Sequence, residues 1–164
     1  MWGKLRSQRK KINSQLASLS FEDYKPSLPA PSLFAFTEAI VTASIPSSLT
    51  IASQLAGLGQ GLTPSGDDFM MGALYAVWII YPHKFSAVLA DEIEKTAAPL
   101  TTSLSAAWLR SAGKGEAGEL WHHLFDALVT GDELRMQESV DNILAVGETS
   151  GADAFAGFIG TLQS

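Results

Sequence analysis

Hydrophobic side chains recur along most of this chain at the three- and four-residue spacing of an amphipathic helix, and no stretch alternates convincingly with period two. The segment KFSAVLADEIEKTAA (84–98) shows this clearly, with apolar residues on one face and charged residues on the other. Prolines and glycines separate such segments from one another. The pattern therefore predicts an all-α protein, a single compact domain of about eight helices over residues 1–164.

The breaks between apolar segments set the expected helix boundaries. The N-terminal region, 1–30, is predicted to hold a basic helix over 4–19 and a proline-rich connection. Residues 49–58 are ambiguous between helix and strand, and we favour a helix. The other predicted helices span 32–44, 65–81, 84–98, 103–111, 116–130, 133–146 and 151–162. Capping residues are expected at Ser65, at one of Thr101, Thr102 and Ser103, and at Asp132 after a stop at Gly131.

The longest uncharged apolar run, Phe69 to Tyr81, follows a glycine-rich loop over 59–65. A membrane-spanning helix needs roughly 20 apolar residues, whereas this run is shorter and contains Gly72. We therefore expect a buried central helix opened by the glycine-rich loop, in a protein that does not associate with membranes.

Composition narrows the classes of function. Charged residues make up 17% and hydrophobic residues 46% of the chain, as in folded proteins. Cysteine is absent, which excludes disulfides and cysteine nucleophiles and fits a cytoplasmic protein. The net charge is −6, and five basic residues cluster between Lys4 and Lys11, which leaves an acidic body. Because nucleic-acid binding draws on clustered Lys and Arg, we expect no nucleic-acid partner.

The pattern Ser-Gly-x-Asp-x-x-x-Gly occurs at 65–72 and again at 150–157, each time at the start of an apolar helix. One interpretation is two independent caps, because Ser and Asp accept bonds from free N–H groups at helix N-termini. The other is that both N-termini converge on one pocket, with Thr101 to Ser103 at its rim. In that case Gly72 and Gly157 should lie where the two helices cross.

The first copy carries more than a cap requires. Glycines before a helix let backbone amides turn toward an anion, and the helix N-terminus favours negative charge. The segment is neither a P-loop nor a dinucleotide fingerprint. Because Asp67 and Asp68 would repel a bare phosphate, they indicate either a shared Mg²⁺ ion or the N–H donors of an amide or ureido group. The candidate ligand-binding residues here are Gly59, Gly61, Thr63, Ser65, Gly66, Asp67 and Asp68.

Other polar residues have simpler explanations. His122 and His123 are neighbours on a helix and point about 100° apart, so we expect surface or partly buried histidines rather than metal ligands. Ser65 lacks the nearby base that a nucleophile needs. The hydroxyls at Thr101 to Ser103 either cap a helix or face the ligand. The tryptophans of the apolar helices, Trp78, Trp108 and Trp121, are expected in the core.

GLGQGLTPSGDDFMMG (57–72) resembles the signature of the AllH-like family, long catalogued as a domain of unknown function. TTSLSAAWLRSAGKGE (101–116) and VGETSGADAFAGFIGTL (146–162) follow in the order expected of that family. The resemblance covers roughly residues 47–162. Typical members have more chain before the glycine-rich loop, so a substrate group supplied by that part is expected to be absent here or to come from another chain.

The resemblance implies a subunit of oxamate carbamoyltransferase, an enzyme of purine or allantoin breakdown that converts oxalurate and phosphate to oxamate and carbamoyl phosphate. It also implies FdrA-like and AllG-like partner subunits and a small anionic or ureido metabolite. A non-catalytic metabolite-binding or scaffold subunit is the alternative.

Family site residues carry over residue by residue. Ser65, Thr63 and the amides around Gly66 would bind an oxyanion or phosphate. Asp67 and Asp68 would hold Mg²⁺ or the ureido nitrogens, and together with Ser65 they are the candidate catalytic residues. The remaining ligand-binding candidates are Gly59, Gly61, Thr101, Thr102, Ser103, Ser150, Gly151 and Asp153.

Overall fold

The computed structural model describes residues 1–24 and 26–164, and in this part of the chain it contains ten α-helices, two short 3-10 helices and no strand. The all-α prediction is confirmed, with close to the expected number of helices. In chain order they are α1 (Trp2–Ser7), α2 (Arg9–Gln15), η1 (Phe21–Tyr24), α3 (Ala30–Val41), α4 (Ile45–Leu55), α5 (Ser65–Ile80), α6 (His83–Ala97), η2 (Ala98–Leu100), α7 (Ser103–Gly113), α8 (Glu119–Thr130), α9 (Glu133–Leu144) and α10 (Ser150–Gln163).

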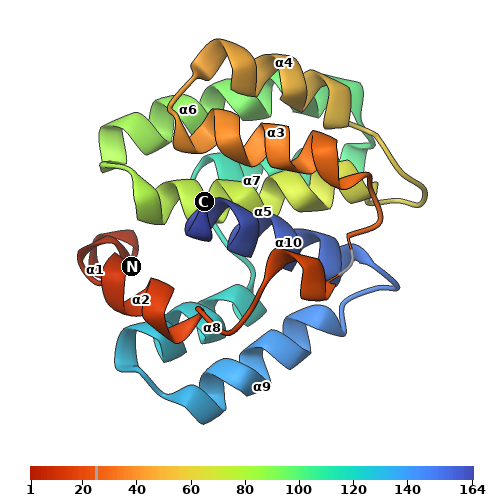
Figure 1. Ribbon diagram of the computed structural model, residues 1–164. Coiled ribbons are helices and arrows are strands. Elements are labelled where there is room, and N and C mark those ends of the chain that lie inside the picture. Colours follow the sequence, from red (N-terminus) through yellow and green to blue (C-terminus); the bar gives the residue numbers. More distant parts are fainter. Residues whose placement is uncertain (25) are drawn as a thin grey trace.

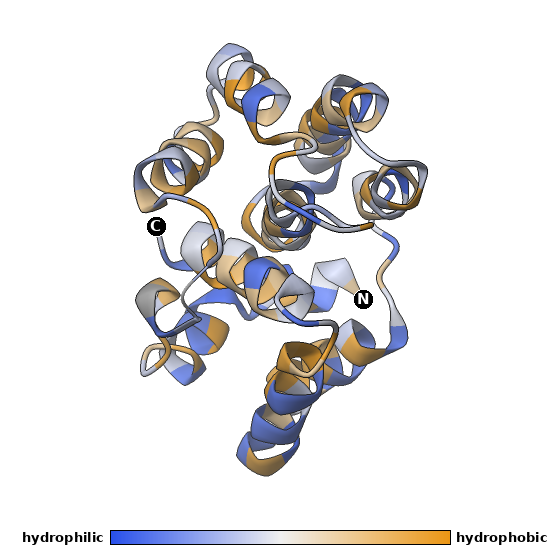
Figure 2. Ribbon diagram, turned by 90° about the vertical axis from the view of Figure 1, so that its right-hand side faces the viewer, coloured by the Kyte–Doolittle hydropathy of each residue, from blue (hydrophilic) through white to orange (hydrophobic). Residues whose placement is uncertain are grey.

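Helix α5 is the centre of the fold. Almost all of its residues are buried, which confirms the predicted central helix. In Figure 1 it runs through the middle of the molecule, with α3 and α4 on one side and α10 on the other. The hydrophobic sides of the surrounding amphipathic helices face inward and their polar sides face outward (Figure 2). The first residues of α5, Ser65 to Asp68, are therefore buried inside the protein.

Helices α5 and α10 cross with their backbones in direct contact. A Cβ atom at Gly72 would overlap the carbonyl oxygen of Ala154, and a Cβ atom at Gly157 would overlap the carbonyl oxygen of Phe69. Any larger residue would therefore push the helices apart. The prediction that Gly72 and Gly157 mark the crossing of these two helices is confirmed.

Helices α8 and α9 form an antiparallel pair beside α10 (Figure 1). Gly131 ends α8 with a left-handed backbone, φ 80°, and the side chain of Asp132 accepts a hydrogen bond from the amide of Arg135 at 3.1 Å. These are the predicted stop and cap.

The single helix predicted over 4–19 is wrong. The chain turns at Gln8 and forms α1, which packs on α5 and α8, and α2, which packs on α8. Trp2 and Arg6 hold α1 in place by donating hydrogen bonds to the carbonyl oxygens of Gly115, at 2.8 Å, and Trp78, at 3.1 Å. These distant partners are invisible to local periodicity.

The helix predicted over 49–58 begins earlier, at Ile45. Pro46 lies in its first turn, where the missing N–H costs no helical hydrogen bond. Within the described residues, every helix is too short or too polar to cross a bilayer.

Candidate functional site

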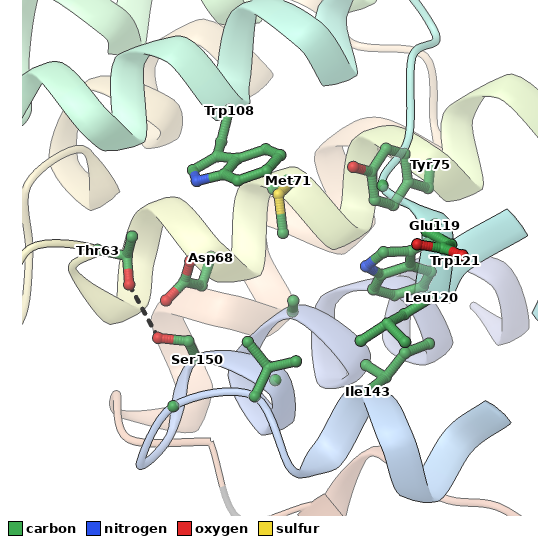
Figure 3. Close-up of a pocket in the computed structure, with 15 residues that line it drawn as sticks. Thr63, Asp68, Met71, Tyr75, Trp108, Glu119, Leu120, Trp121, Ile143 and Ser150 are labelled. Carbon is green, nitrogen blue, oxygen red and sulfur yellow. Dashed lines mark hydrogen bonds between the residues drawn. The ribbon is translucent and has the colours of Figure 1, made fainter. Parts of the chain in front are cut away.

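A cavity of about 430 Å³ lies beside α5, between α7 and the first turns of α8 and α10 (Figure 3). The residues from α5 share one face of that helix at spacings of three and four. The lining residues are Thr63, Asp68, Met71, Tyr75, Trp108, Gly118, Glu119, Leu120, Trp121, Ile143, Val146, Gly147, Ser150, Gly151 and Ala154.

One end of the cavity is polar and joins the two copies of the repeated motif. The hydroxyls of Thr63 and Ser150 form a hydrogen bond of 2.8 Å, and Asp68 lies beside them (Figure 3). Asp68 is 5% exposed, and its Oδ2 atom has no hydrogen-bond partner among the described residues. A buried carboxylate oxygen without a donor is costly. Asp68 is thus the one predicted catalytic residue that faces the cavity with an acceptor to spare.

Burial changes the acidity of Asp68. Its pKa is raised from 3.8 to about 7, chiefly because the buried carboxylate loses hydration. The hydroxyls of Ser150 and Thr63 oppose this shift, while the negative charges of Asp153 and Asp67 add to it. Near neutral pH this carboxyl group can therefore both accept and release a proton.

The rest of the cavity is largely apolar and aromatic. Met71 and Tyr75 come from α5, Trp121 from α8 and Ile143 from α9 (Figure 3). Trp108 of α7 is 45% exposed, so its expected place in the core is wrong, whereas Trp78 and Trp121 are buried as expected.

The lining of the cavity, in the described part of the chain, contains acidic side chains but no basic ones. Asp68 and Glu119 line the cavity, and among the described lining residues there is no lysine, arginine or histidine. His122 and His123 are exposed, as expected.

Asp67 points elsewhere. Its Oδ1 atom accepts a hydrogen bond from the amide of Gly57 at 3.1 Å, and Thr101 donates its hydroxyl to Oδ2. Burial raises its pKa, and these hydrogen bonds lower it. Adjacent residues of a helix are about 100° apart, so only one of the two aspartates can face the cavity. Among the described residues no cluster of three or more His, Asp or Glu side chains is arranged to hold a metal ion.

The glycines of the glycine-rich loop and Ser65 shape the start of α5 but do not line the cavity. Gly59 and Gly61 have positive φ angles, and a Cβ atom at Gly59 would lie 2.7 Å from the amide nitrogen of Ser65. A Cβ atom at Gly66 would overlap the carbonyl oxygen of Leu55. The expected cap at Ser65 is wrong: Pro64 occupies the N-cap position, so Ser65 is already the first helical residue. The N-cap makes no side-chain hydrogen bond.

The hydroxyl cluster also lies outside the cavity lining. Thr101 binds Asp67, and Ser103 is exposed at the start of α7. Thr102 is the predicted cap, since its hydroxyl accepts a hydrogen bond from the amide of Ser105 at 3.1 Å. The same hydroxyl donates to the carbonyl oxygen of Leu62 at 2.6 Å. These residues fix the loop that carries Thr63.

Part of the second motif lines the cavity. Ser150 and Gly151 line the cavity, so the two helix N-termini do share a pocket. Asp153 faces another segment: it accepts hydrogen bonds from the amide of Ser27 at 2.8 Å and from the Ser27 hydroxyl at 3.2 Å. The structure thus brings Thr63, Asp68, Ser150 and Gly151 together and leaves Asp153 apart.

Sequence reasoning missed the aromatic and apolar walls. One available signal is in α7, where Ala106, Leu109 and Ala112 form the buried face and Leu104 and Trp108 lie on the other side. Two large apolar residues one turn apart on an outer face indicate a binding surface. No comparable signal marks Tyr75, which is buried like its neighbours on α5.

Comparison with known families supports the resemblance noted in the sequence. The family model for oxamate carbamoyltransferase subunit AllH matches residues 55–162, which include α5 to α10 and the whole cavity lining. No solved structure matches the chain. With most of its length matched by that model, the chain belongs to the AllH family of oxamate carbamoyltransferase subunits.

Proposed function

We propose that this chain holds the ureido group of oxalurate at Asp68 during carbamoyl transfer to phosphate, as part of purine or allantoin breakdown in the cytoplasm. The observation that carries the proposal is the buried, unpartnered Oδ2 atom of Asp68, which lies at a cavity in a member of the AllH family. A ureido group offers N–H donors, and the Oδ2 atom of Asp68 accepts no hydrogen bond from the described residues.

The chain itself contains a comparable interaction. At Asp153 the carboxylate accepts a backbone amide N–H and a hydroxyl from Ser27. A ureido N–H resembles a peptide N–H in geometry and acidity. Asp68 occupies the equivalent position in the other motif, so the Asp153–Ser27 pair supports an amide-like ligand for it.

Carbamoyl transfer requires proton movement as well as binding. An oxygen of hydrogen phosphate forms a bond to the carbamoyl carbon, the bond from that carbon to the oxamate nitrogen breaks, and a proton passes from phosphate to that nitrogen. With a pKa of about 7, Asp68 can carry this proton in either direction. The hydroxyls of Thr63 and Ser150 would donate to the developing oxyanion, and the N-terminus of α10 favours negative charge there.

The other predicted catalytic residues take supporting roles in this proposal. Asp67 orders the loop through Gly57 and Thr101, and Ser65 begins α5. Mg²⁺ is the other candidate occupant of Asp68. The residues present fit it only with help from substrate, because Asp67 already accepts two hydrogen bonds and Mg²⁺ commonly takes one carboxylate plus phosphate oxygens.

The test is calorimetric titration of the purified chain with oxalurate, oxamate and carbamoyl phosphate, each with and without Mg²⁺. Asp68→Asn should weaken oxalurate binding at least 10-fold, because the amide replaces an acceptor oxygen with a donor nitrogen. Asp126→Asn, an exposed change on α8, is the matched control and should bind as wild type does.

Turnover separates the two classes of function. Phosphate release from carbamoyl phosphate and oxamate, lost in Asp68→Asn, would support a catalytic subunit. Binding without turnover, even after FdrA-like and AllG-like subunits are added, would support the metabolite-binding alternative. Equal oxalurate affinity in wild type and Asp68→Asn would contradict the proposal.

A further inference from the structure

Exposed apolar side chains surround one side of the cavity. We call them the leucine rim, and they are Leu58, Leu62, Leu100, Leu104 and Trp108, each between 43% and 76% exposed. They come from the loop before α5, from η2 and from the outer face of α7.

The members of the leucine rim are held close to one another. The hydroxyl of Thr102 donates to the carbonyl oxygen of Leu62 at 2.6 Å, which ties the loop to the start of α7. A Cβ atom at Gly57 would lie 2.7 Å from the carbonyl oxygen of Leu100, so the loop also touches η2. Leu104 and Trp108 are one turn apart on α7, and the ring of Trp108 points from α7 toward Met71 in the cavity lining (Figure 3). The segments that carry the leucine rim are therefore held next to one another, and one member, Trp108, lines the cavity.

The described cavity lining lacks a positive charge for the anions of the proposed reaction. Oxalurate and phosphate are both anions, whereas Asp68 and Glu119 are the charged residues among the described lining. Like charges repel most strongly where they are buried, which applies to Asp68, whereas the side chain of Glu119 is exposed. The helix N-termini offset only part of this, since each corresponds to about half an elementary charge. The described lining supplies no basic side chain to offset the rest, and His123, 3.9 Å from Glu119, is exposed and lies outside the lining.

We propose that the leucine rim is the docking surface for another subunit of the carbamoyltransferase, which covers the cavity and inserts an arginine or lysine into it. Apolar contacts with the rim supply the binding area, and the cation neutralises the two anionic substrates. Arginine suits the task best because its planar guanidinium binds carboxylate and phosphate oxygens in pairs. This proposal rests on the proposed function, because it is the substrates' charge that calls for a cation.

The surface is tested by co-purifying the chain with FdrA-like and AllG-like subunits and measuring the complex by light scattering and calorimetry. Leu62→Asp and Leu104→Asp should each weaken assembly at least 10-fold, and neither residue lines the cavity. Leu134→Asp on α9 and Val88→Asp on α6, also highly exposed, are the controls and should assemble normally. Circular dichroism checks that all four variants keep the wild-type helix content.

Several outcomes would overturn the docking surface. Undiminished assembly of both rim variants would do so, as would the absence of any complex between these subunits and the wild-type chain. A homodimer of this chain that dissociates in Leu62→Asp would assign the rim to a second copy instead.

The arginine or lysine proposed for the partner is tested separately, by measuring oxalurate affinity. Oxalurate should bind the assembly at least 10-fold more tightly than it binds the isolated chain, and this gain should fall as salt rises. Equal affinity of the two would overturn the supply of charge by a partner. Failure of the proposed function is distinguishable, because Asp68→Asn would then leave oxalurate binding unchanged in an assembly that still depends on the leucine rim.

Discussion

Asp68 and Asp153 occupy the same position in two copies of one sequence pattern, yet they differ in what reaches them. The carboxylate of Asp153 is satisfied by Ser27, a residue of its own chain, and is 1% exposed. Asp68 is also almost wholly buried, but one of its oxygens has no partner in the described structure and faces a cavity. The difference lies in the neighbours, because Ser27 donates to Asp153, whereas no described residue donates to Oδ2 of Asp68.

This contrast teaches that a repeated motif specifies a shared backbone geometry more firmly than a shared chemistry. Both copies place a glycine at the helix crossing and a carboxylate in the first turn. What the carboxylate does depends on which distant segment folds over it. The following predictions separate the shared part of the two copies from the part that differs.

The largest effect is expected at the crossing. Gly72→Ala and Gly157→Ala should each lower the free energy of unfolding by about 3 kcal/mol or more, because the added methyl group overlaps a backbone carbonyl that cannot move alone. Urea denaturation followed by circular dichroism measures this. Gly3→Ala, where a Cβ atom meets nothing within 4 Å, is the control and should not destabilise the protein. Tolerance of alanine at either crossing position would break the equivalence of the two copies.

The next largest effect on stability is expected at Asp153, whose carboxylate is hydrogen-bonded to Ser27. Asp153→Asn should lower the free energy of unfolding by about 2 kcal/mol, since it removes a charged acceptor from two hydrogen bonds with Ser27. The same denaturation experiment at neutral pH gives the value. A neutral effect would mean that the segment containing Ser27 contributes little to holding α10.

Replacing the unsatisfied carboxylate, that of Asp68, should raise the free energy of unfolding rather than lower it. The folded-state pKa of Asp68, about 7, exceeds its ordinary value of 3.8, so the folded protein binds more protons between these pH values. Its contribution to stability is therefore present below about pH 4 and is lost as pH rises to about 7. Asp68→Asn should remove this loss and stabilise the protein by about 1 kcal/mol or more at pH 8.

Unfolding free energies measured from pH 4 to pH 8 check the sign. The wild-type stability should fall relative to Asp68→Asn across this range, and the two curves should run parallel above it. A variant that is less stable than wild type at pH 8 would show that Asp68 has a donor after all.

The smallest effect separates the two donors of Ser27. Ser27→Ala removes only the hydroxyl bond, whose 3.2 Å length makes it the weaker of the two, and leaves the amide bond of 2.8 Å. The expected loss is about 0.5 kcal/mol in the free energy of unfolding. A loss as large as that of Asp153→Asn would place most of the interaction in the hydroxyl.

Much of the fold could be predicted because its signals are local. The helical periodicity, the apolar run of α5 and the stop at Gly131 each depend on a few neighbouring residues, and all are found in the structure. The crossing could also be predicted, because two glycines inside apolar helices need a reason to be there. The turn at Gln8 could not, since α1 and α2 are positioned by contacts with α5 and α8, which are remote in the sequence.

The candidate site was less accessible from the sequence. The pattern identified Thr63, Asp68, Ser150 and Gly151, which do line one cavity. It could not distinguish Asp68 from Asp67, because that choice depends on the rotation of α5 against α10. The apolar walls come from α7, α8 and α9 and carry no motif, so they are seen only once the helices are packed.

The crossing of α5 and α10 also bears on how the protein folds. The pair α8–α9 and the pair α6–α7 join segments that follow each other in the chain, whereas α5 and α10 lie far apart along it. Contacts between remote segments must first overcome loop-closure entropy, so we expect the crossing to form late in folding. The bond between Thr63 and Ser150 forms with it. Partly folded chains therefore have no polar end to the cavity, and a bound ligand should slow unfolding while leaving the rate of folding nearly unchanged.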